Sequence, residues 1–316
     1  MEISGFLAYF IFFLTFVGIY GVLILGLNLQ WGFTGQVNFG VAAFFMVGAY
    51  AMAIATTAPT DDHLGGFGLP FVVGLIIAMI ISGALAFLVG IVTLRLRADY
   101  LAIATIGIAE IVRQFLKNED WLTNGVRGIV DIRKPYEGEL GGAEPLVYLA
   151  IVAVAVAIVF FALERLRKSP FGRVLRALRE NEDTARASGK SIVSFQLQVF
   201  VLGSSIMGLA GGLYASFFSF ISPEAFTNTI ANFLPWVMLI AGGSGNNYGT
   251  MLGAFVIWVV WTVTDYVINQ VIPADMVTKA GALRLLLIGV LLQVILLFRP
   301  KGLLPEGFRL KFMRKE

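Results

Sequence analysis

The residues that could carry out chemistry in this 316-residue chain are few. Cysteine is absent, which excludes disulfides, thiolate metal sites and cysteine nucleophiles. The single histidine, His63, follows Asp61 and Asp62 in a polar stretch without a set of metal ligands around it, so we interpret it as a solvated loop residue. Neither a histidine cluster nor a recognisable nucleophile with its base is present, and the sequence therefore argues against an enzyme and predicts no catalytic or metal site.

Gly189-Lys190-Ser191 resembles the end of a phosphate-binding loop. The first glycine of that motif would have to stand at position 184, which is Thr184, and a helix is expected before it where the motif requires a strand. We therefore reject a nucleotide site in this chain. No cofactor is expected here, and if ATP powers this protein, another polypeptide binds it together with Mg²⁺.

The composition is that of a membrane protein. Hydrophobic residues make up 58% of the chain and charged residues only 14%, whereas soluble domains carry roughly a quarter charged residues. A hydrocarbon layer about 30 Å thick needs about 20 apolar residues per helical span. The sequence predicts an all-α integral membrane protein, a single domain over 1–316 with about nine (eight to ten) spans, at roughly 6–30, 36–57, 69–93, 99–116, 145–163, 195–220, 230–245, 250–272 and 280–298.

Three of these spans could be broken or re-entrant. Gly35, Gly40 and Gly48 interrupt the second, and only the glycine-rich stretch 242–249 separates the seventh from the eighth, where we expect a sharp turn. Small residues give the sixth span a face that favours close helix packing, within the chain or against a second subunit: Gly203, Ser204, Gly208, Gly211, Gly212 and Ala215.

Lysine and arginine gather on cytoplasmic loops, which sets the orientation. The segment 165–190, the C-terminal tail from Arg299 and the pair Arg95 and Arg97 fall on one side by span counting, and we expect that side to be cytoplasmic. The N-terminus and the stretch near 61 then lie outside. The connection 117–144 also lies outside, although it carries Lys117, Arg127, Arg133 and Lys134, and this is at odds with the rule. We expect a multi-pass protein of the cytoplasmic (inner) membrane.

The inner loop at about 165–193 holds the clearest signal. Ser169 is placed as an N-cap with Pro170 at the first helical position, and Gly189 suits a helix end. Val174, Leu175, Leu178 and Ala185 form an apolar patch, and charged residues dominate the rest. The pattern predicts a short amphipathic helix, which either lies on anionic lipid headgroups or is gripped by a soluble partner.

A few polar side chains lie inside predicted spans. Glu110 and Arg113 are spaced to pair on one helix face, either as a structural ion pair or as part of a functional site, and Asp265 has no evident partner. Asp99 and Tyr100 suit an interfacial anchor. Unpaired polar groups are costly in hydrocarbon, so the amides and glycines of 26–40 must face protein or water. Our candidates for a substrate path are Gln36, Asn38, Thr105 and Glu110, with interhelical hydrogen bonding as the alternative for the amides.

The inner loop resembles the cytoplasmic loop of ABC importer permeases, in which a helix docks into the ATPase subunit. Glu182, Ala185, Ala187 and Gly189 match that motif, whereas Thr184, Ser188 and Lys190 depart from it. The stretches 26–53, 94–116, 208–226, 238–255 and 297–305 further resemble, in order, the Liv-type permeases of branched-chain amino acid importers, to which urea and short-amide permeases are similar. The resemblance implies coupling residues at Arg173, Val174, Leu175, Arg176, Leu178, Arg179, Glu182, Ala185 and Gly189.

The resemblance also implies partners: ABC ATPase subunits, a second permease subunit in a homo- or heterodimer, an extracytoplasmic solute-binding protein and membrane lipid, but no nucleic acid. The leading hypothesis is an importer permease for branched-chain or related amino acids. Its alternatives are a urea or short-chain amide permease and an ion-coupled secondary transporter or channel. Charge reversal at Arg176 and Arg179 is predicted to lower coupled ATPase activity and transport.

Overall fold

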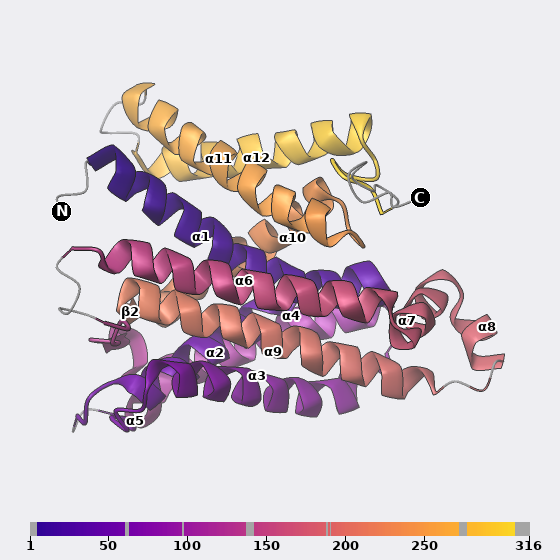
Figure 1. Ribbon diagram of the computed structural model, residues 1–316, viewed down its shortest axis with the longest axis horizontal. Helices are drawn as coiled ribbons and strands as arrows, with labels where there is room; N and C mark the ends of the chain where they lie inside the picture. The colour runs from indigo at the N-terminus through magenta and orange to yellow at the C-terminus, as the bar shows by residue number, and fades with distance from the viewer. Residues whose placement is uncertain are drawn as a thin grey trace.

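The structure is a computed structural model that describes residues 5–60, 63–96, 98–136, 142–187, 189, 191–271 and 277–306. It is an array of helices that run along one axis (Figure 1). The long helices and their shorter apolar companions are α1 (Gly5–Leu27), α2 (Val41–Thr56), α3 (Phe71–Thr93), α4 (Ala98–Asn118), α6 (Glu144–Lys168), α9 (Ile192–Phe218), α10 (Leu234–Gly242), α11 (Asn247–Val271) and α12 (Val277–Phe298). These helices confirm the polytopic helical fold.

Among the described residues, six helices are long and apolar enough to cross a membrane: α1 with its extension to Gly32, α3, α6, α9, α11 and α12. Two apolar helices are shorter, Val41–Thr56 and Thr229–Gly242, and they occupy the second and seventh predicted spans. α4 has the length of a span but carries Glu110, Arg113 and Lys117. The predicted bounds 36–57 and 230–245 were therefore too long, because residues 35–40 are not helical and α10 ends at Gly242.

Helix α9 is the centre of the packing and contacts α1, α2 and α3. The predicted small-residue face makes these contacts inside the chain. A Cβ at Gly48 of α2 would lie 2.3 Å from the Gly208 carbonyl oxygen, and one at Gly211 would lie 2.0 Å from the Phe45 carbonyl oxygen. Only glycine allows the backbones to approach this closely, so the small residues fix how α2 and α9 cross.

Two π-helical turns interrupt the apolar helices. The first, η1 (Asn28–Gly32), continues α1, and the second, η4 (Thr229–Phe233), leads into α10. After η1 and a short helical turn, residues 35–40 form neither helix nor strand, and α2 begins at Val41. Such turns are frequent at functional sites. We call residues 28–40 the broken segment.

One end of the molecule carries short elements that cap the helices. They are α5 (Asp120–Thr123), η2 (Gly125–Arg127), β1 (Ile129–Val130), β2 (Phe220–Ile221) and η3 (Pro223–Phe226). Strands β1 and β2 pair antiparallel, with Ile129 opposite Ile221. This pairing holds residues 129 and 130 of the outer connection against the end of α9.

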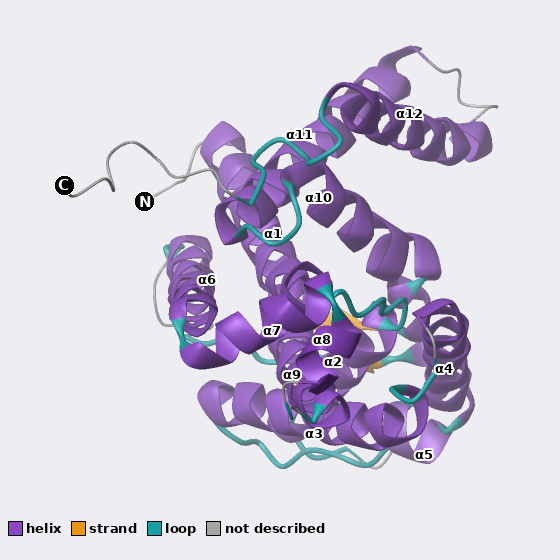
Figure 2. Ribbon diagram, turned by 90° about the vertical axis from the view of Figure 1, so that its right-hand side faces the viewer, coloured by secondary structure: helices purple, strands orange, loops and turns teal. Residues whose placement is uncertain are grey.

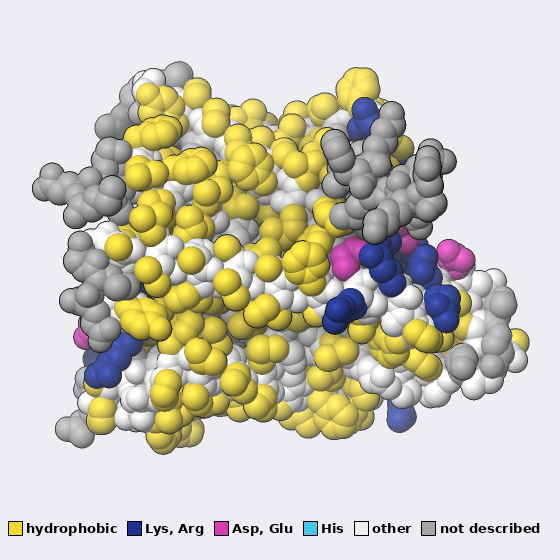
Figure 3. Space-filling model, viewed as in Figure 1, with side chains coloured by type: hydrophobic (Ala, Val, Ile, Leu, Met, Phe, Trp, Pro, Cys, Tyr) yellow, Lys and Arg dark blue, Asp and Glu magenta, His cyan; other side chains and the backbone are white. Residues whose placement is uncertain are grey.

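The other end carries α7 (Pro170–Glu180) and α8 (Glu182–Ala187), together with the end of α12 (Figures 1 and 2). The apolar surface over the middle of the molecule gives way to lysine and arginine side chains toward this end (Figure 3). This end of the molecule carries Arg95, the basic cluster 165–186 and Lys301, as the span count predicted. Arg97 and the tail from residue 307 lie outside the described residues.

Candidate functional site

The inner loop folds into two helices, which we call the coupling segment (residues 170–187). The predicted N-cap is confirmed, because the Gly172 N–H donates to the Ser169 hydroxyl at 3.2 Å. The expected short amphipathic helix is present as α7, but it ends at Glu180, and after Asn181, whose backbone is extended, a second helix, α8, starts at Glu182. Gly189 has a φ of +74°, which suits a helix end.

The apolar side of the coupling segment packs inward. Leu175, Leu178 and Ala185 are buried, and Val174 is half-buried. Phe171 beside them lies 5.4 Å from Phe195 of α9, between ring centroids. The exposed side carries Arg173, Glu180, Glu182, Asp183 and Arg186. The surface that this segment offers to another molecule is therefore mainly charged, and its apolar patch joins it to its own chain.

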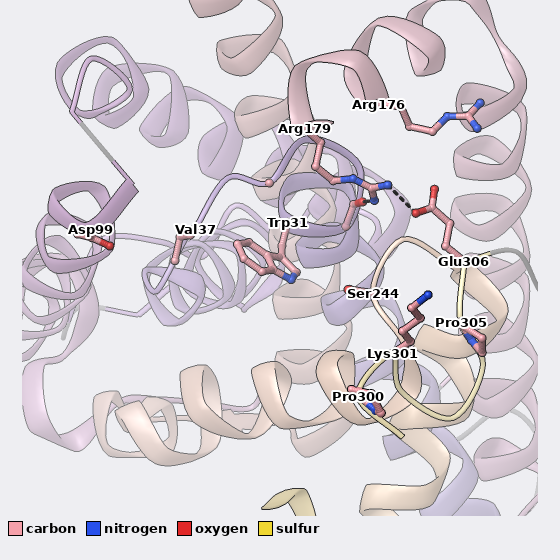
Figure 4. Close-up of a pocket in the computed structure, with 12 residues that line it drawn as sticks. Trp31, Val37, Asp99, Arg176, Arg179, Ser244, Pro300, Lys301, Pro305 and Glu306 are labelled. Atoms are coloured by element: carbon pink, nitrogen blue, oxygen red, sulfur yellow. Dashed lines mark hydrogen bonds and ion pairs between the residues drawn. The ribbon is translucent and has the colours of Figure 1, made fainter. Parts of the chain in front are cut away.

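Arg179 joins the coupling segment to two other parts of the chain. Its guanidinium donates to the Gly32 carbonyl at the end of η1 and pairs with the Glu306 carboxylate at 2.5 Å. The side chain lies between Trp31 and Glu306 (Figure 4). Residue 179 is thus an internal clamp between α7, the broken segment and the C-terminal end of the described chain.

The partner of Arg179 stands on a strap, residues 299–306, that runs back along the 242–249 turn. The Leu303 and Leu304 N–H groups each donate at 2.9 Å, to the carbonyls of Ala241 and Gly242. The Asn246 amide donates at 3.2 Å to the carbonyls of Leu304 and Pro305. The predicted glycine-rich turn is confirmed, and its backbone is the surface on which this strap lies.

A buried polar chain continues from the broken segment to α6. Asn28 donates to the Asn247 side chain at 2.9 Å and accepts from the Gly245 N–H at 2.8 Å. Asn247 in turn donates to Glu164 at 3.0 Å, and Glu164 pairs with Arg167 at 2.9 Å. Each of these bonds satisfies a polar group that would be costly in an apolar surrounding.

The middle of the broken segment is held by a second set of hydrogen bonds. Gln30 donates to the Phe200 carbonyl at 2.9 Å and accepts from Asn38 at 2.8 Å. The Asn38 carbonyl accepts from the Trp236 indole N–H at 3.1 Å. The α2 amide of Ala42 is capped by Asn232 of η4 at 2.9 Å. η4 therefore lies at the start of α2, and η1 is linked to the same region through the bond between Gln30 and Asn38.

The candidate path residues divide into two groups. Gln36, Asn38 and Thr105 come together, because Thr105 accepts from the Phe39 N–H at 3.1 Å and Gln36 donates to the Gln196 carbonyl at 2.9 Å. Glu110 lies elsewhere, in an outer cluster with Arg113, Lys117 and Glu224. Arg113 lies 2.7 Å from Glu110, which confirms the predicted pairing, and 3.4 Å from Glu224, which also accepts from Lys117 at 2.7 Å.

Two cavities adjoin the broken segment on the side of the coupling segment. The larger, about 1230 Å³, has Trp31, Val37, Asp99, Arg176, Arg179 and Lys301 in its wall. The smaller, about 590 Å³, is lined by Gln36, Leu178, Arg179 and Glu182 among others. The side-chain amide oxygen (Oε1) of Gln36 is buried and has no hydrogen-bond partner among the described residues. The cavities combine apolar side chains with charges of both signs, which can accommodate a zwitterion.

Several contacts were not predicted from the sequence. Asp265 has a partner after all, since it pairs with Arg284 of α12, whose guanidinium also lies 4.8 Å from the Trp261 ring. Glu306 and Asn247 were likewise not singled out. The partners of all three residues lie far away in the chain. Only for Asp265 did the sequence contain a signal, which was an opposite charge on the next span.

Comparisons with known proteins place the chain among transport permeases. A family model described as the permease component of the branched-chain amino acid transport system matches residues 9–296. The chain is 33% identical to the probable branched-chain amino acid transport permease protein LivM of Methanocaldococcus jannaschii, over 93% of this chain and 92% of that protein. It is 32% identical to the high-affinity LivM permease of Salmonella typhimurium, over 92% of this chain and 69% of that protein. It is also 24% identical to LivH of the same organism, over 90% and 91% of the two chains. No solved structure matches the chain.

Proposed function

This chain belongs to the family of branched-chain amino acid transport system permease components, and from that membership we propose that it is the membrane subunit of an ATP-driven importer for branched-chain amino acids. It is a multi-pass membrane transport subunit and not an enzyme.

The contact of Arg179 with Gly32 is the observation that carries the mechanism. A force applied to the exposed side of α7 reaches the broken segment through this contact and through the buried Leu175 and Leu178. The broken segment can respond because residues 36–40 lie outside any regular helix, so a shift there disrupts no run of helical hydrogen bonds. Such a local shift can open or close a route between two discrete arrangements of packed helices.

ATP and Mg²⁺ bind a separate ATPase subunit in this proposal. That subunit docks on the charged face formed by Arg173, Glu180, Glu182 and Arg186, which is exposed and not used in packing. Arg186 pairs only loosely with Glu182 and Asp183, at 3.8 Å and 3.5 Å, so these side chains can exchange partners at low cost.

The substrate leaves through the cavity of about 1230 Å³. Trp31 and Val37 suit an aliphatic side chain, while Asp99 and Lys301 offer opposite charges to an ammonium and a carboxylate. Urea and short amides carry no formal charges and at most a short aliphatic chain, so this wall favours an amino acid. Gln36, Asn38 and Thr105 shape the inner end of the route, and Glu110 lies at its outer end.

The coupling segment and the strap face the cytoplasm, and the N-terminus with the β1–β2 end faces outward. Three basic regions at one end support this orientation. A second permease subunit of the same family completes the transporter, and an extracytoplasmic solute-binding protein delivers substrate to the outer end.

Reconstitution tests this function. The complex, co-expressed with its ATPase subunits and purified into liposomes, should take up radiolabelled leucine only with internal ATP and external binding protein. Uptake of urea or acetamide instead of leucine would show that the substrate is an amide and not a branched-chain amino acid. Uptake by the lone chain driven by an ion gradient would overturn the proposal.

A further inference from the structure

A buried row of hydrogen bonds holds the π-turn η1 at a second place, apart from Arg179. The Asn28 side chain accepts from the Gly245 N–H at 2.8 Å and donates to the Asn247 side chain at 2.9 Å. Asn247 donates in turn to Glu164 of α6 at 3.0 Å. Asn28 and Asn247 are fully buried, and Glu164 is 7% exposed. We call Asn28, Asn247 and Glu164 the polar link, which connects η1 through the start of α11 to α6.

One end of the polar link holds the residue that Arg179 contacts. A Cβ at Gly32 would collide with the side-chain oxygen of Asn28, so this oxygen lies directly against Gly32. In a continuing α-helix the Gly32 carbonyl would accept from the Gln36 N–H. That N–H donates to the Gln30 carbonyl at 3.1 Å instead. The Gly32 carbonyl is thereby left for Arg179, and Asn28 fixes the turn that presents it.

The other end of the polar link lies at the junction of α6 with the coupling segment. Glu164 stands near the end of α6 and also pairs with Arg167 at 2.9 Å. The Ser169 hydroxyl, which caps α7, donates to the Leu166 carbonyl at 2.6 Å. A Cβ at Gly172 would lie 2.6 Å from the Arg167 carbonyl oxygen. α7 therefore packs directly on the last turn of α6 (Figure 1), so that a displacement of α7 also displaces Glu164.

We propose that the polar link is a second mechanical connection between the coupling segment and the broken segment, an inference that rests on the proposed function. Arg179 contacts the last residue of η1, whereas the polar link holds its first residue, Asn28. Apolar contacts allow helices to slide, but a fully paired buried polar network fixes one arrangement. With both connections present, η1 follows α7 as one unit. With the polar link broken, α7 moves while η1 stays behind.

Moving the buried carboxylate from one residue of the link to its neighbour tests the proposal. Asn247→Asp replaces the donor to Glu164 with a second carboxylate, and two charged carboxylates repel each other in a buried site. Glu164→Gln added to it restores the bond, because the new glutamine amide donates to the new aspartate and its oxygen accepts from Arg167. In proteoliposomes of the full complex, Asn247→Asp should lower leucine uptake per ATP roughly tenfold. The double variant should recover most of this loss.

Glu164→Gln alone gives the sharper comparison. It leaves one side-chain oxygen for two donors, Asn247 and Arg167, so uptake per ATP should fall severalfold. Adding Asn247→Asp should then raise uptake per ATP, although the same substitution lowers it in the wild type. This reversal of sign can be measured even where the single Asn247→Asp variant does not assemble. A lower value in the double variant than in Glu164→Gln would overturn the link.

Thr250→Val is the matched structural control. Thr250 is fully buried in the first turn of α11, and its hydroxyl donates to the Asn246 carbonyl at 3.0 Å, outside the polar link. This variant should lower the yield of the complex and leave uptake per ATP unchanged. A wild-type complex without ATP-driven leucine uptake would overturn the proposed function. Wild-type uptake together with equal uptake per ATP in Asn247→Asp would overturn the polar link alone, and so would an equal loss in Thr250→Val.

Discussion

The guanidinium of Arg179 lies against the carbonyl of Gly32, although 147 residues separate them in the chain. Gly32 ends the π-turn that opens the broken segment, and Arg179 stands in the helix that we propose is moved by an ATPase. This contact links the helix that we propose an ATPase moves to the segment that we propose shapes the substrate route. The predictions below depend on it or test its surroundings.

Arg179→Gln should uncouple ATP hydrolysis from transport. A hydrogen bond to a charged group contributes about 1.5–3 kcal/mol, so losing it should lower leucine uptake per ATP roughly tenfold. The exposed Arg165 at the end of α6 provides the matched control, because Arg165→Gln removes the same charge outside the proposed docking face. Uptake and ATPase rates in proteoliposomes measure both. Equal effects of the two variants would show that charge and not the internal clamp matters.

Glu306→Gln should weaken the connection between α7 and the broken segment less than Arg179→Gln does, because the bond from Arg179 to Gly32 remains. A double-mutant cycle of the two substitutions should give a coupling energy of about 0.5–3 kcal/mol, which is typical of residues in one network. Thermal unfolding of the purified complex measures it. Strict additivity would mean that the strap does not hold Arg179 in place.

Charge reversal on the exposed side of the coupling segment should release the ATPase. Glu180→Lys with Glu182→Lys changes two exposed carboxylates and leaves the buried leucines intact, so the permease should fold while co-purification of the ATPase subunit falls. Circular dichroism and pull-down from the co-expressed complex check the two parts. Full ATPase recovery with the double variant would place the docking surface elsewhere.

The outer cluster should loosen at acid pH. The hydrogen bond from Lys117 holds the pKa of the Glu224 carboxyl below its ordinary value of 4.5. A lowered pKa in the folded state stabilises the contact above pH 4.5, and this contribution is lost as the pH falls through the folded value. Hydrogen exchange of residues 223–226, corrected for intrinsic rates, should therefore rise at low pH. Glu224→Gln should remove this pH dependence, and an unchanged profile in that variant would contradict it.

The sequence was sufficient for features that depend on local pattern. Apolar length located the long helices, and the Ser169-Pro170 pair located the start of α7. Glu110 and Arg113 pair because three residues along a helix bring them to one face. The glycines of α9 predicted close packing, and their contacts with α2 are of that kind.

Contacts between distant segments could not be predicted from the sequence. The charged pattern of α7 suggested that Arg179 faces a partner, but the same residue can turn inward once the strap and the π-turn are adjacent. The break at Asn181 was missed because helical periodicity continues across it in Ala185. Asp265 found Arg284 only because α12 packs beside α11.

Movement of the broken segment during ATP turnover tests the central claim most directly. Spin labels at Arg173→Cys and, separately, Val37→Cys can each be paired with a reference label at Trp121→Cys on the outer end, since the native chain lacks cysteine. With ATP trapped on the complex, both distances should shift in the wild-type background. With Arg179→Gln added, residue 173 should still move while residue 37 stays in place. An equal shift of residue 37 with and without Arg179 would contradict the account.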